Sequence, residues 1–214
     1  MKSPRVPVAQ EGYPFIGLAG FVTLVCALLD YDFLALLGLA LTTYVLYFFR
    51  DPERVTPSDA DVIVSPADGK VIVVERVFDE RHLRDHAYKV SIFMNLFNVH
   101  VNRAPYAGQV ERVHYLPGMF YSADTEQGAL SNEACAMTMT TGRGARLAVV
   151  QVAGLIARRI VCWAEPGDAL VKGERFGLIR FGSRVDLYLP LSAQIEVAVG
   201  QKVRAGETVL GYLP

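Results

Sequence analysis

The chain has 214 residues and a formal net charge of −1, so it can hold one sizeable domain with an appendage. Such a balanced charge lacks the basic excess of nucleic-acid-binding proteins, and we expect no nucleic-acid partner. The three cysteines, Cys26, Cys135 and Cys162, form no Cys-x-x-Cys pair. This spacing argues against a disulfide framework and a zinc site, and it fits a reducing, cytoplasmic compartment.

Two uncharged apolar runs lie near the N-terminus, at residues 13–29 and 33–49. Each has 17 residues, at the lower limit for a helix that crosses a bilayer. Acidic residues connect the runs and basic residues flank their outer ends, so the positive-inside rule predicts a hairpin with both ends on the cytoplasmic side of the cell (inner) membrane. Two alternatives remain open: a shallow hairpin within one leaflet, and a buried helical pair packed on the following domain.

A proline-containing, charged linker at residues 50–60, "RDPERVTPSDA", separates these runs from a strand-rich remainder. We expect a helical hairpin with its linker at 1–54 and a β-rich domain at 55–214. From residue 61 onward, β-branched and aromatic runs alternate with Gly, Pro and Asp-Gly, which predicts a mostly antiparallel, barrel-like domain.

A weak internal repeat refines this fold class. "GDALVKGERFG" and "GQKVRAGETVLG" both place short strand-like pieces between glycines, with a Gly-Glu or Ala-Gly-Glu turn between them. This pattern is similar to the lipoyl and biotinyl hammerhead domains. The predicted fold is therefore mainly β (α+β), of the hammerhead or barrel-sandwich-hybrid type, preceded by the helical hairpin.

Reactive polar residues interrupt the apolar strands at three places. Asp68 lies in "SPADGKV", where Asp-Gly would equally suit a hairpin turn. His100 lies in "FNVHVNRAP" and is the best general base among the four histidines, since imidazole titrates near neutrality, although a lone strand histidine is commonly structural.

The third place is Gly182-Ser183, which stands between strand-like segments in "KGERFGLIRFGSRVDLYLP" without the residues of a hairpin turn. The sequence is not the Gly-x-Ser-x-Gly elbow of a serine hydrolase, and a β-bulge with a surface serine is the simpler local interpretation. Together, however, Ser183 as nucleophile, His100 as base and Asp68 as its orienting group supply the parts of an Asp-His-Ser relay.

The glycine before the serine suggests a reaction of the chain with itself. Gly182 leaves its carbonyl uncrowded and permits a strained backbone, so Ser183 Oγ can attack that carbonyl and convert the peptide to an ester. Elimination of the ester leaves dehydroalanine at the new N-terminus, which hydrolyses to a pyruvoyl group and ammonia. This self-cleavage requires a base for the hydroxyl and for Cα, with donors for the oxyanion.

The chain at this point resembles the phosphatidylserine decarboxylases, pyruvoyl enzymes that mature by this serinolysis. The resemblance covers the membrane hairpin and nearly the whole chain beyond the linker. Its motifs occur here in the family's order: "FFRDPER", "VSPADGKV", "FNVHVNRAP" with "GQVERVHYLPGMF", "SNEA", "VQVAGLIARRIV" and "GERFGLIRFGSRVDLYLP".

The resemblance implies roles at matching positions. Asp68 and His100 match the catalytic aspartate and histidine, and Ser183 matches the serine that becomes the pyruvoyl group after cleavage from Gly182. The products would be a β chain, 1–182, and an α chain, 183–214, that remain together as a heterodimer. The departure is at the cleavage site, where Phe181-Gly182-Ser183-Arg184 replaces the Leu-Gly-Ser-Thr of long bacterial members. This change, with the short chain, resembles the compact subfamily that is also found in archaea, so the choice between an ester lipid and an archaeal ether lipid stays open.

The implied reaction is decarboxylation of phosphatidylserine to phosphatidylethanolamine and CO2, through a Schiff base with the pyruvoyl group. The enzyme would be a lyase and zymogen of phospholipid biosynthesis, without pyridoxal phosphate or metal. Apolar neighbours of His100, among them Phe93, Met94, Leu96 and Phe97, are expected to line the pocket. Arg103 and Arg158 are candidates for the lipid phosphate on charge alone, with a surface ion pair as the equal alternative.

Two rival functions deserve comparison. A pyruvoyl decarboxylase of free amino acids would share the cleavage chemistry, but the hairpin and motif order argue against it. A membrane-anchored hammerhead adaptor without catalysis would explain the hairpin and the glycine repeat. It would not explain Asp68, His100 and Gly182-Ser183 together, and neither Lys172 nor Lys202 has the Met or Ala neighbours of a carrier lysine.

Overall fold

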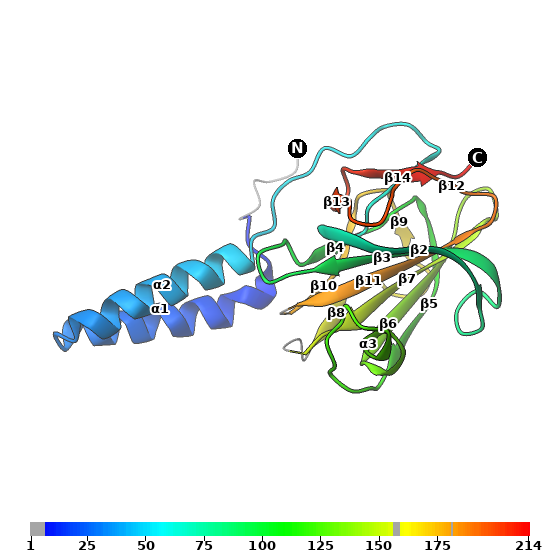
Figure 1. Cartoon of the computed structure of the whole chain (residues 1–214). Helices are drawn as coiled ribbons and strands as arrows, with labels where there is room; N and C mark the ends of the chain where they lie inside the picture. The colour runs from blue at the N-terminus through cyan, green and yellow to red at the C-terminus, as the bar shows by residue number, and fades with distance from the viewer. Residues whose placement is uncertain (1–6, 156–158, 181) are drawn as a thin grey trace. The chain divides into compact units, whose positions relative to one another are not determined.

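The structure is a computed structural model that describes residues 7–155, 159–180 and 182–214. Its internal contacts divide it into two compact units, Met1–Glu53 and Arg54–Pro214. The first unit is helical and the second is built almost entirely of strands (Figure 1).

The first unit is a helical hairpin. A 3-10 turn, η1 (Gln10–Gly12), leads into α1 (Tyr13–Leu28), and α2 (Asp32–Phe48) returns beside it. The helices meet through small and polar groups: Thr23 Oγ1 lies 3.2 Å from Thr42 Oγ1, and Gly38 packs directly over Thr23. The absence of a side chain at Gly38 permits this close approach, which is typical of helix pairs in a membrane.

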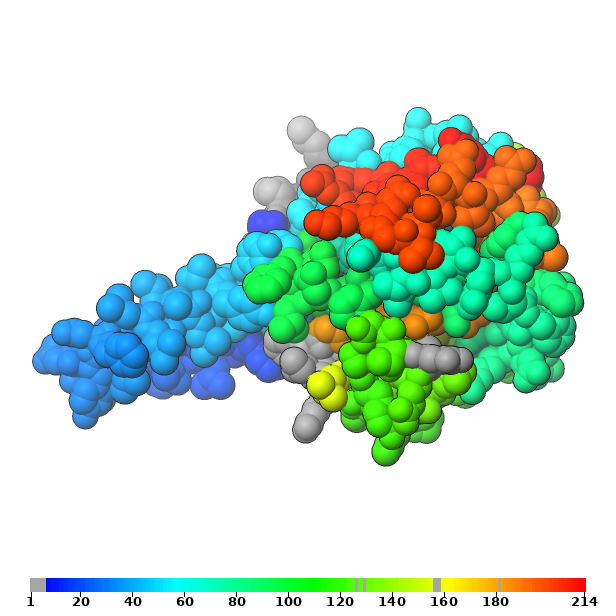
Figure 2. All heavy atoms as spheres, viewed as in Figure 1, coloured from blue at the N-terminus to red at the C-terminus, as the bar shows by residue number. Residues whose placement is uncertain are grey.

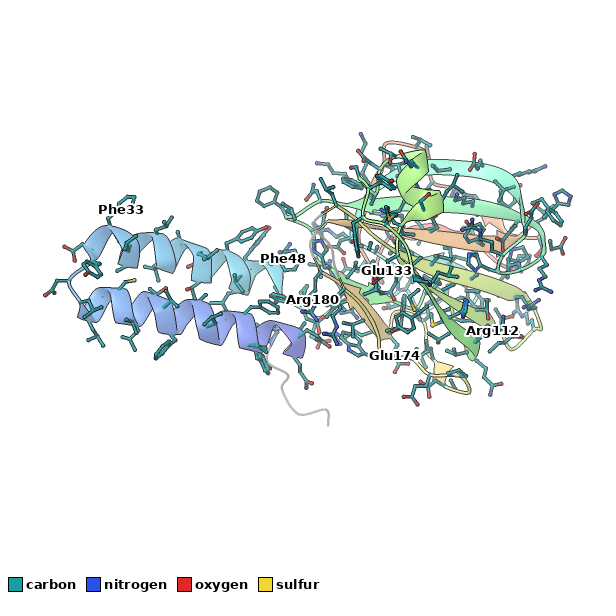
Figure 3. The ribbon with its side chains drawn as sticks, turned by 90° about the horizontal axis from the view of Figure 1, so that it is seen from below. Phe33, Phe48, Arg112, Glu133, Glu174 and Arg180 are labelled. Atoms are coloured by element: carbon teal, nitrogen blue, oxygen red, sulfur yellow. The ribbon has the colours of Figure 1, made fainter. Side chains whose placement is uncertain are left out.

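The outer surface of this hairpin is apolar. Within the described residues α1 buries no side chain and α2 buries only Phe48. Phe33, at the tip, projects outward and is 77% exposed (Figure 3). The helix Gln10–Leu28 is long and apolar enough to cross a membrane, while Asp32–Phe48 is a shorter apolar helix.

The second unit contains three sheets within the described ranges, each paired antiparallel along its named strands. The largest has eight strands in the order β13-β2-β3-β11-β7-β6-β5-β9, and the smaller ones have the orders β4-β10-β8 and β1-β14-β12. The large sheet comprises β2 (Gly69–Asp79), β3 (Asp85–Met94), β5 (Gly108–Leu116), β6 (Ala134–Thr140), β7 (Arg146–Ala153), β9 (Ala169–Leu170), β11 (Ser183–Pro190) and β13 (Lys202–Val203). The smaller sheets comprise β4 (Val101–Arg103), β8 (Ile160–Cys162) and β10 (Arg175–Ile179), then β1 (Val62–Val64), β12 (Gln194–Ile195) and β14 (Val209–Tyr212).

The hydrophobic core lies between these sheets, because the large sheet curls around it like half a barrel (Figure 1). Strand β11 shows the cause: Val185, Leu187 and Leu189 alternate onto the inner face and are fully buried. Phe176 and Ile179 of β10 meet this core from the other side. The prediction of a mainly β, barrel-like domain after an apolar helical segment is confirmed.

One helix, α3 (Glu126–Ser131), was not predicted. It begins at Thr125, whose Oγ1 accepts a hydrogen bond from Gly128 N at 3.1 Å. Six residues are too few to show a helical period in the sequence, so only this cap signals the helix.

The glycine repeat forms two turns that touch. Gly173 and Gly206 have φ of +80° and +74°, in the left-handed region that glycine tolerates best. A Cβ added at Gly206 would lie 3.6 Å from the Cα of Gly173. The strand after the second turn, β14, is the middle strand of the C-terminal sheet, between β1 and β12. The strand before this turn, β13, pairs with β2, and the C-terminal segment lies on the surface (Figure 2).

Candidate functional site

The site begins where the chain passes from the small sheet β4-β10-β8 to the large sheet. Strand β10 ends at Ile179 and β11 begins at Ser183, so Gly182 stands at the corner between the two sheets. Its φ of +65° lies in the left-handed region, which costs a residue with a side chain about 1 kcal/mol or more. The glycine is therefore required by the turn of the backbone, and the strand on either side agrees with the sequence pattern.

Ser183 is the first residue of β11 and faces the protein interior. It pairs with Met94 of β3 and Ala153 of β7, on the inner face that it shares with Val185. The residue is 0% exposed, and its Oγ has no hydrogen-bond partner among the described residues. A buried hydroxyl without a partner costs about 1–3 kcal/mol, so its presence here needs a functional reason.

His100 lies against the same corner. Its Nε2 is 3.3 Å from Gly182 N, from which it accepts a hydrogen bond, and its Nδ1 is 3.0 Å from the carbonyl oxygen of Asn98. A carbonyl can only accept, so Nδ1 carries the proton and Nε2 is left as the basic nitrogen. His100 is 2% exposed, and its backbone is tied to β10, since Ile179 N donates to His100 O.

Asp68 lies at the same end of the large sheet. Lys70 of β2 and Arg184 of β11 both pair with Phe93 of β3, and Asp68 and Gly182 each stand just before the first residue of these strands. Asp68 is not in a hairpin turn: the segment 65–68 connects β1 of one sheet to β2 of another.

The Asp68 carboxylate is held by two groups of its own. Arg54 donates to both carboxylate oxygens, at 2.9 and 3.2 Å, and Ala205 N donates to Oδ1 at 2.7 Å. Arg54 also reaches Glu207 at 3.1 Å, and its side chain is 9% exposed. The described partner of His100 Nδ1 is the Asn98 carbonyl. The role of Asp68 as the group that orients His100 stays a prediction.

Gly154, directly after β7, packs against the Gly182–Ser183 peptide bond. A Cβ added at Gly154 would lie 2.2 Å from Gly182 O and 3.0 Å from Gly182 C. No real Cβ approaches an oxygen so closely, so residue 154 must lack a side chain for Gly182 O to occupy its present position.

Replacement of Gly154 by alanine is therefore expected to slow the predicted cleavage of the Gly182–Ser183 bond by about 100-fold, because a displacement of about 1 Å at a reacting group has that effect. The measurement is the fraction of cleaved chain against time on denaturing gels. Gly142→Ala is the matched control, since a Cβ there meets nothing within 4 Å. Equal cleavage rates for the two variants would contradict the role of Gly154.

A cavity of about 230 Å³ opens beside Gly182. Its walls are mainly apolar and come from the segments after β3 and β7 and from the stretch before α3. The lining residues are Phe93, Asn95, Leu96, Ser122, Ala123, Gly154, Leu155 and Gly182. Of the apolar neighbours expected around the pocket, Phe93 and Leu96 line it, whereas Met94 is buried in the core and Phe97 is 65% exposed.

Arg103 and Arg158 are the two arginines suggested to bind the lipid phosphate. Arg103 is buried, and its Nη1 donates to Gly173 O at 2.9 Å, where it supports one of the paired glycine turns. It is not among the residues that line the cavity. Arg158 lies outside the described residues.

Comparisons with known proteins bear on this arrangement. The family model described as phosphatidylserine decarboxylase matches residues 41–211. The chain is 58% identical over 213 residues to a protein of Desulfotalea psychrophila, and 50% identical over 214 residues to one of Geotalea uraniireducens, with 100% of each chain covered. Both relatives are named phosphatidylserine decarboxylase proenzyme. The chain belongs to the phosphatidylserine decarboxylase family.

Membership in this decarboxylase family makes the chain an enzyme, a carboxy-lyase, as its motifs predicted. A third relative, from Geobacter sulfurreducens, is 48% identical over 219 residues, with 100% of both chains covered, and carries the same name. The word proenzyme in these names describes a precursor, and in this decarboxylase Ser183 and Gly182 occupy the corner described above.

Three contacts around these residues could not be predicted from the sequence. Arg54 stands in the motif "FFRDPER", but nothing in the sequence alone links it to Asp68. Gly154 stands in "VQVAGLIARRIV", where an unexplained glycine after a β-branched run was the available signal. The carbonyl of Asn98 had no signal, because every residue has a carbonyl.

Proposed function

We propose that this enzyme decarboxylates phosphatidylserine to phosphatidylethanolamine and CO2, using a pyruvoyl group that it makes from Ser183 by self-cleavage at Gly182–Ser183. The observation that carries the proposal is the buried Ser183 Oγ without a hydrogen-bond partner among the described residues, in the residue that follows a glycine of the left-handed region whose N–H donates to His100 Nε2. The names of the relatives supply the substrate.

Cleavage begins with proton transfer from Ser183 Oγ to His100 Nε2. To reach Oγ, the ring leaves the hydrogen bond with Gly182 N while Nδ1 keeps the Asn98 carbonyl as its anchor. Oγ then bonds to Gly182 C, the C–N bond breaks, and the Ser183 nitrogen takes the proton to become an amine. The same Nε2 then removes the Cα proton of residue 183 as the Cβ–Oγ bond breaks, which leaves Gly182 as a carboxylate and residue 183 as dehydroalanine. Water converts the dehydroalanine to the pyruvoyl group and releases the nitrogen as ammonia.

The residues around Ser183 suit a pyruvoyl group at that position, which would supply a carbonyl for the substrate amine and an electron sink for the loss of CO2. In this proposal His100 Nε2 returns a proton to the substrate Cα. The apolar walls formed by Phe93, Leu96 and Leu155 strip water from the reacting carboxylate. Asp68 is the third proposed catalytic residue, after Ser183 and His100, and Arg54 holds its carboxylate.

The two products of cleavage are expected to remain one particle. Strand β11 of the α chain runs between β3 and β7 of the β chain, and β14 lies between β1 and β12. The bond that breaks is thus followed at once by a strand with partners on both sides. We propose that the helical hairpin anchors this heterodimer to the cell membrane with the catalytic domain on the cytoplasmic side, where a two-tailed lipid stays within reach.

Intact mass measurement of the purified full chain, together with CO2 release from phosphatidylserine in detergent micelles, tests this function. We expect two chains, 1–182 and 183–214, the smaller one blocked to Edman chemistry and reactive toward carbonyl reagents. A single intact chain in active material would overturn the proposal. CO2 from free serine alone would favour an amino-acid decarboxylase, and a chain that releases no CO2 from either would favour the adaptor.

A further inference from the structure

Arg184, the residue after Ser183, is a buried charge on the opposite face of β11. Its side chain is 3% exposed, and its Nε lies 2.5 Å from Oδ1 of Asp186. Its Nη2 donates to Ser91 Oγ on the neighbouring strand β3, at 2.8 Å. Ser91 is 0% exposed and stands directly opposite Asp186 in the ladder. The guanidinium thus joins two positions of β11 to β3.

Such an arrangement is costly to build and rigid once built. Removing a guanidinium and a carboxylate from water costs several kcal/mol, which is offset only where geometry and hydrogen bonds are good. The surroundings are dry enough that burial, and then the Asp186 carboxylate, raise the pKa of the Tyr188 hydroxyl. Lys89, 3.9 Å from Asp186 Oδ2, adds a second cation beside the carboxylate.

Self-cleavage changes the backbone next to Arg184. In the intact chain, residue 183 is fixed by peptide bonds on both sides. After cleavage it is a chain end, and conversion to a pyruvoyl group removes its N–H and with it one backbone donor. Chain ends fray unless something ties them down. Arg184 becomes the first residue of the α chain with a complete peptide unit.

We propose that Arg184, through Asp186 and Ser91, is a positioning residue that fixes the new N-terminus of the α chain, so that the group at residue 183 keeps facing the interior beside Gly154 and His100. The proposal rests on the self-cleavage proposed above. Arg184 does not touch the cavity, and its side chain leaves the strand on the face opposite Ser183, so it acts only through the backbone.

The test compares the full-length wild type with Ser91→Ala and Arg184→Lys, which each weaken the tie to β3 without emptying the core. We expect both variants to be cleaved, and kcat for phosphatidylserine in micelles to fall about tenfold with KM changed less than about twofold. The rate at which phenylhydrazine labels the α chain should rise about threefold or more, because a frayed end is more accessible.

The double variant Arg184→Met with Asp186→Leu separates this role from plain stabilisation, since apolar replacement of a buried ion pair is often neutral or stabilising. It should be cleaved and unfold no earlier than wild type, yet show the same loss of kcat. The exposed pair Arg146–Glu111, replaced by Met and Leu, is the control and should change neither value.

Cleaved variants with wild-type kcat and labelling rate would overturn the proposal. A folded double variant that stays uncleaved would also overturn it, since Arg184 would then act before the bond breaks. A wild type without a carbonyl-reactive α chain would instead refute the self-cleavage on which the inference rests.

Discussion

Ser183→Ala leaves the 214-residue chain in one piece and abolishes decarboxylation of phosphatidylserine. Alanine removes the Oγ that must bond to Gly182 C, and no other hydroxyl shares this position, because Ser183 is the first residue of β11 and lies on its inner face. We expect no α chain by intact mass, and activity lowered by at least about 10⁴-fold, since both the nucleophile and the source of the carbonyl group are lost.

The fold of this variant should be unchanged. Ser183 Oγ has no hydrogen-bond partner in the described structure, so alanine removes an unsatisfied polar atom and the melting temperature should be equal or slightly higher. Ser192→Ala, at an exposed position just after β11, is the matched control and should be cleaved like the wild type. Cleavage of Ser183→Ala into chains 1–182 and 183–214 would refute the nucleophile assignment.

Much of the fold could be predicted because the relevant physics is local. Two uncharged runs of helical length are readable without any tertiary information, and alternation in β11 places Val185, Leu187 and Leu189 on one face. The order of the strands within the sheets could not be predicted. Strand β11 pairs with β3 and β7, which precede it by about 90 and 30 residues, and such partners are selected by packing over the whole domain.

The candidate site also contains residues that local sequence reveals and contacts that depend on tertiary packing. Ser183 and His100 could be predicted because their chemistry is carried by their side chains, and Gly182 because a glycine breaks the strand pattern; their roles stay predictions. Gly154 matters through a distance to Gly182 O that depends on the register of β7 against β11. The Asn98 carbonyl orients His100 through backbone geometry alone. A close approach at a glycine and a hydrogen bond to a backbone carbonyl do not require a characteristic side chain, so a single sequence does not reveal them.

The role of His100 predicts a second large effect. His100→Gln keeps a side chain of similar length but has no basic nitrogen, so self-cleavage is expected to slow by about 10²–10⁴-fold, the usual contribution of a positioned general base. The measurement is the rate at which chain 183–214 appears, by gel or intact mass, in freshly purified full-length protein. His114→Gln, at an exposed position of β5, is the control and should mature at the wild-type rate.

A variant with a smaller side chain at residue 100 tests the same role of His100 as a base. His100→Gly leaves a space beside Gly182, whose own surroundings open into the cavity lined by Leu96 and Leu155, so added imidazole can reach the vacated position. We expect imidazole to restore part of the cleavage in His100→Gly and to change neither the wild type nor Ser183→Ala, which lacks the hydroxyl. Rescue of this kind reports a missing base, because a merely structural histidine would not be replaced by a free ring in solution.

If His100→Gln instead matures as fast as His114→Gln, the proton from Ser183 Oγ must go to another group, and Asp68 at the same end of the sheet becomes the first to test.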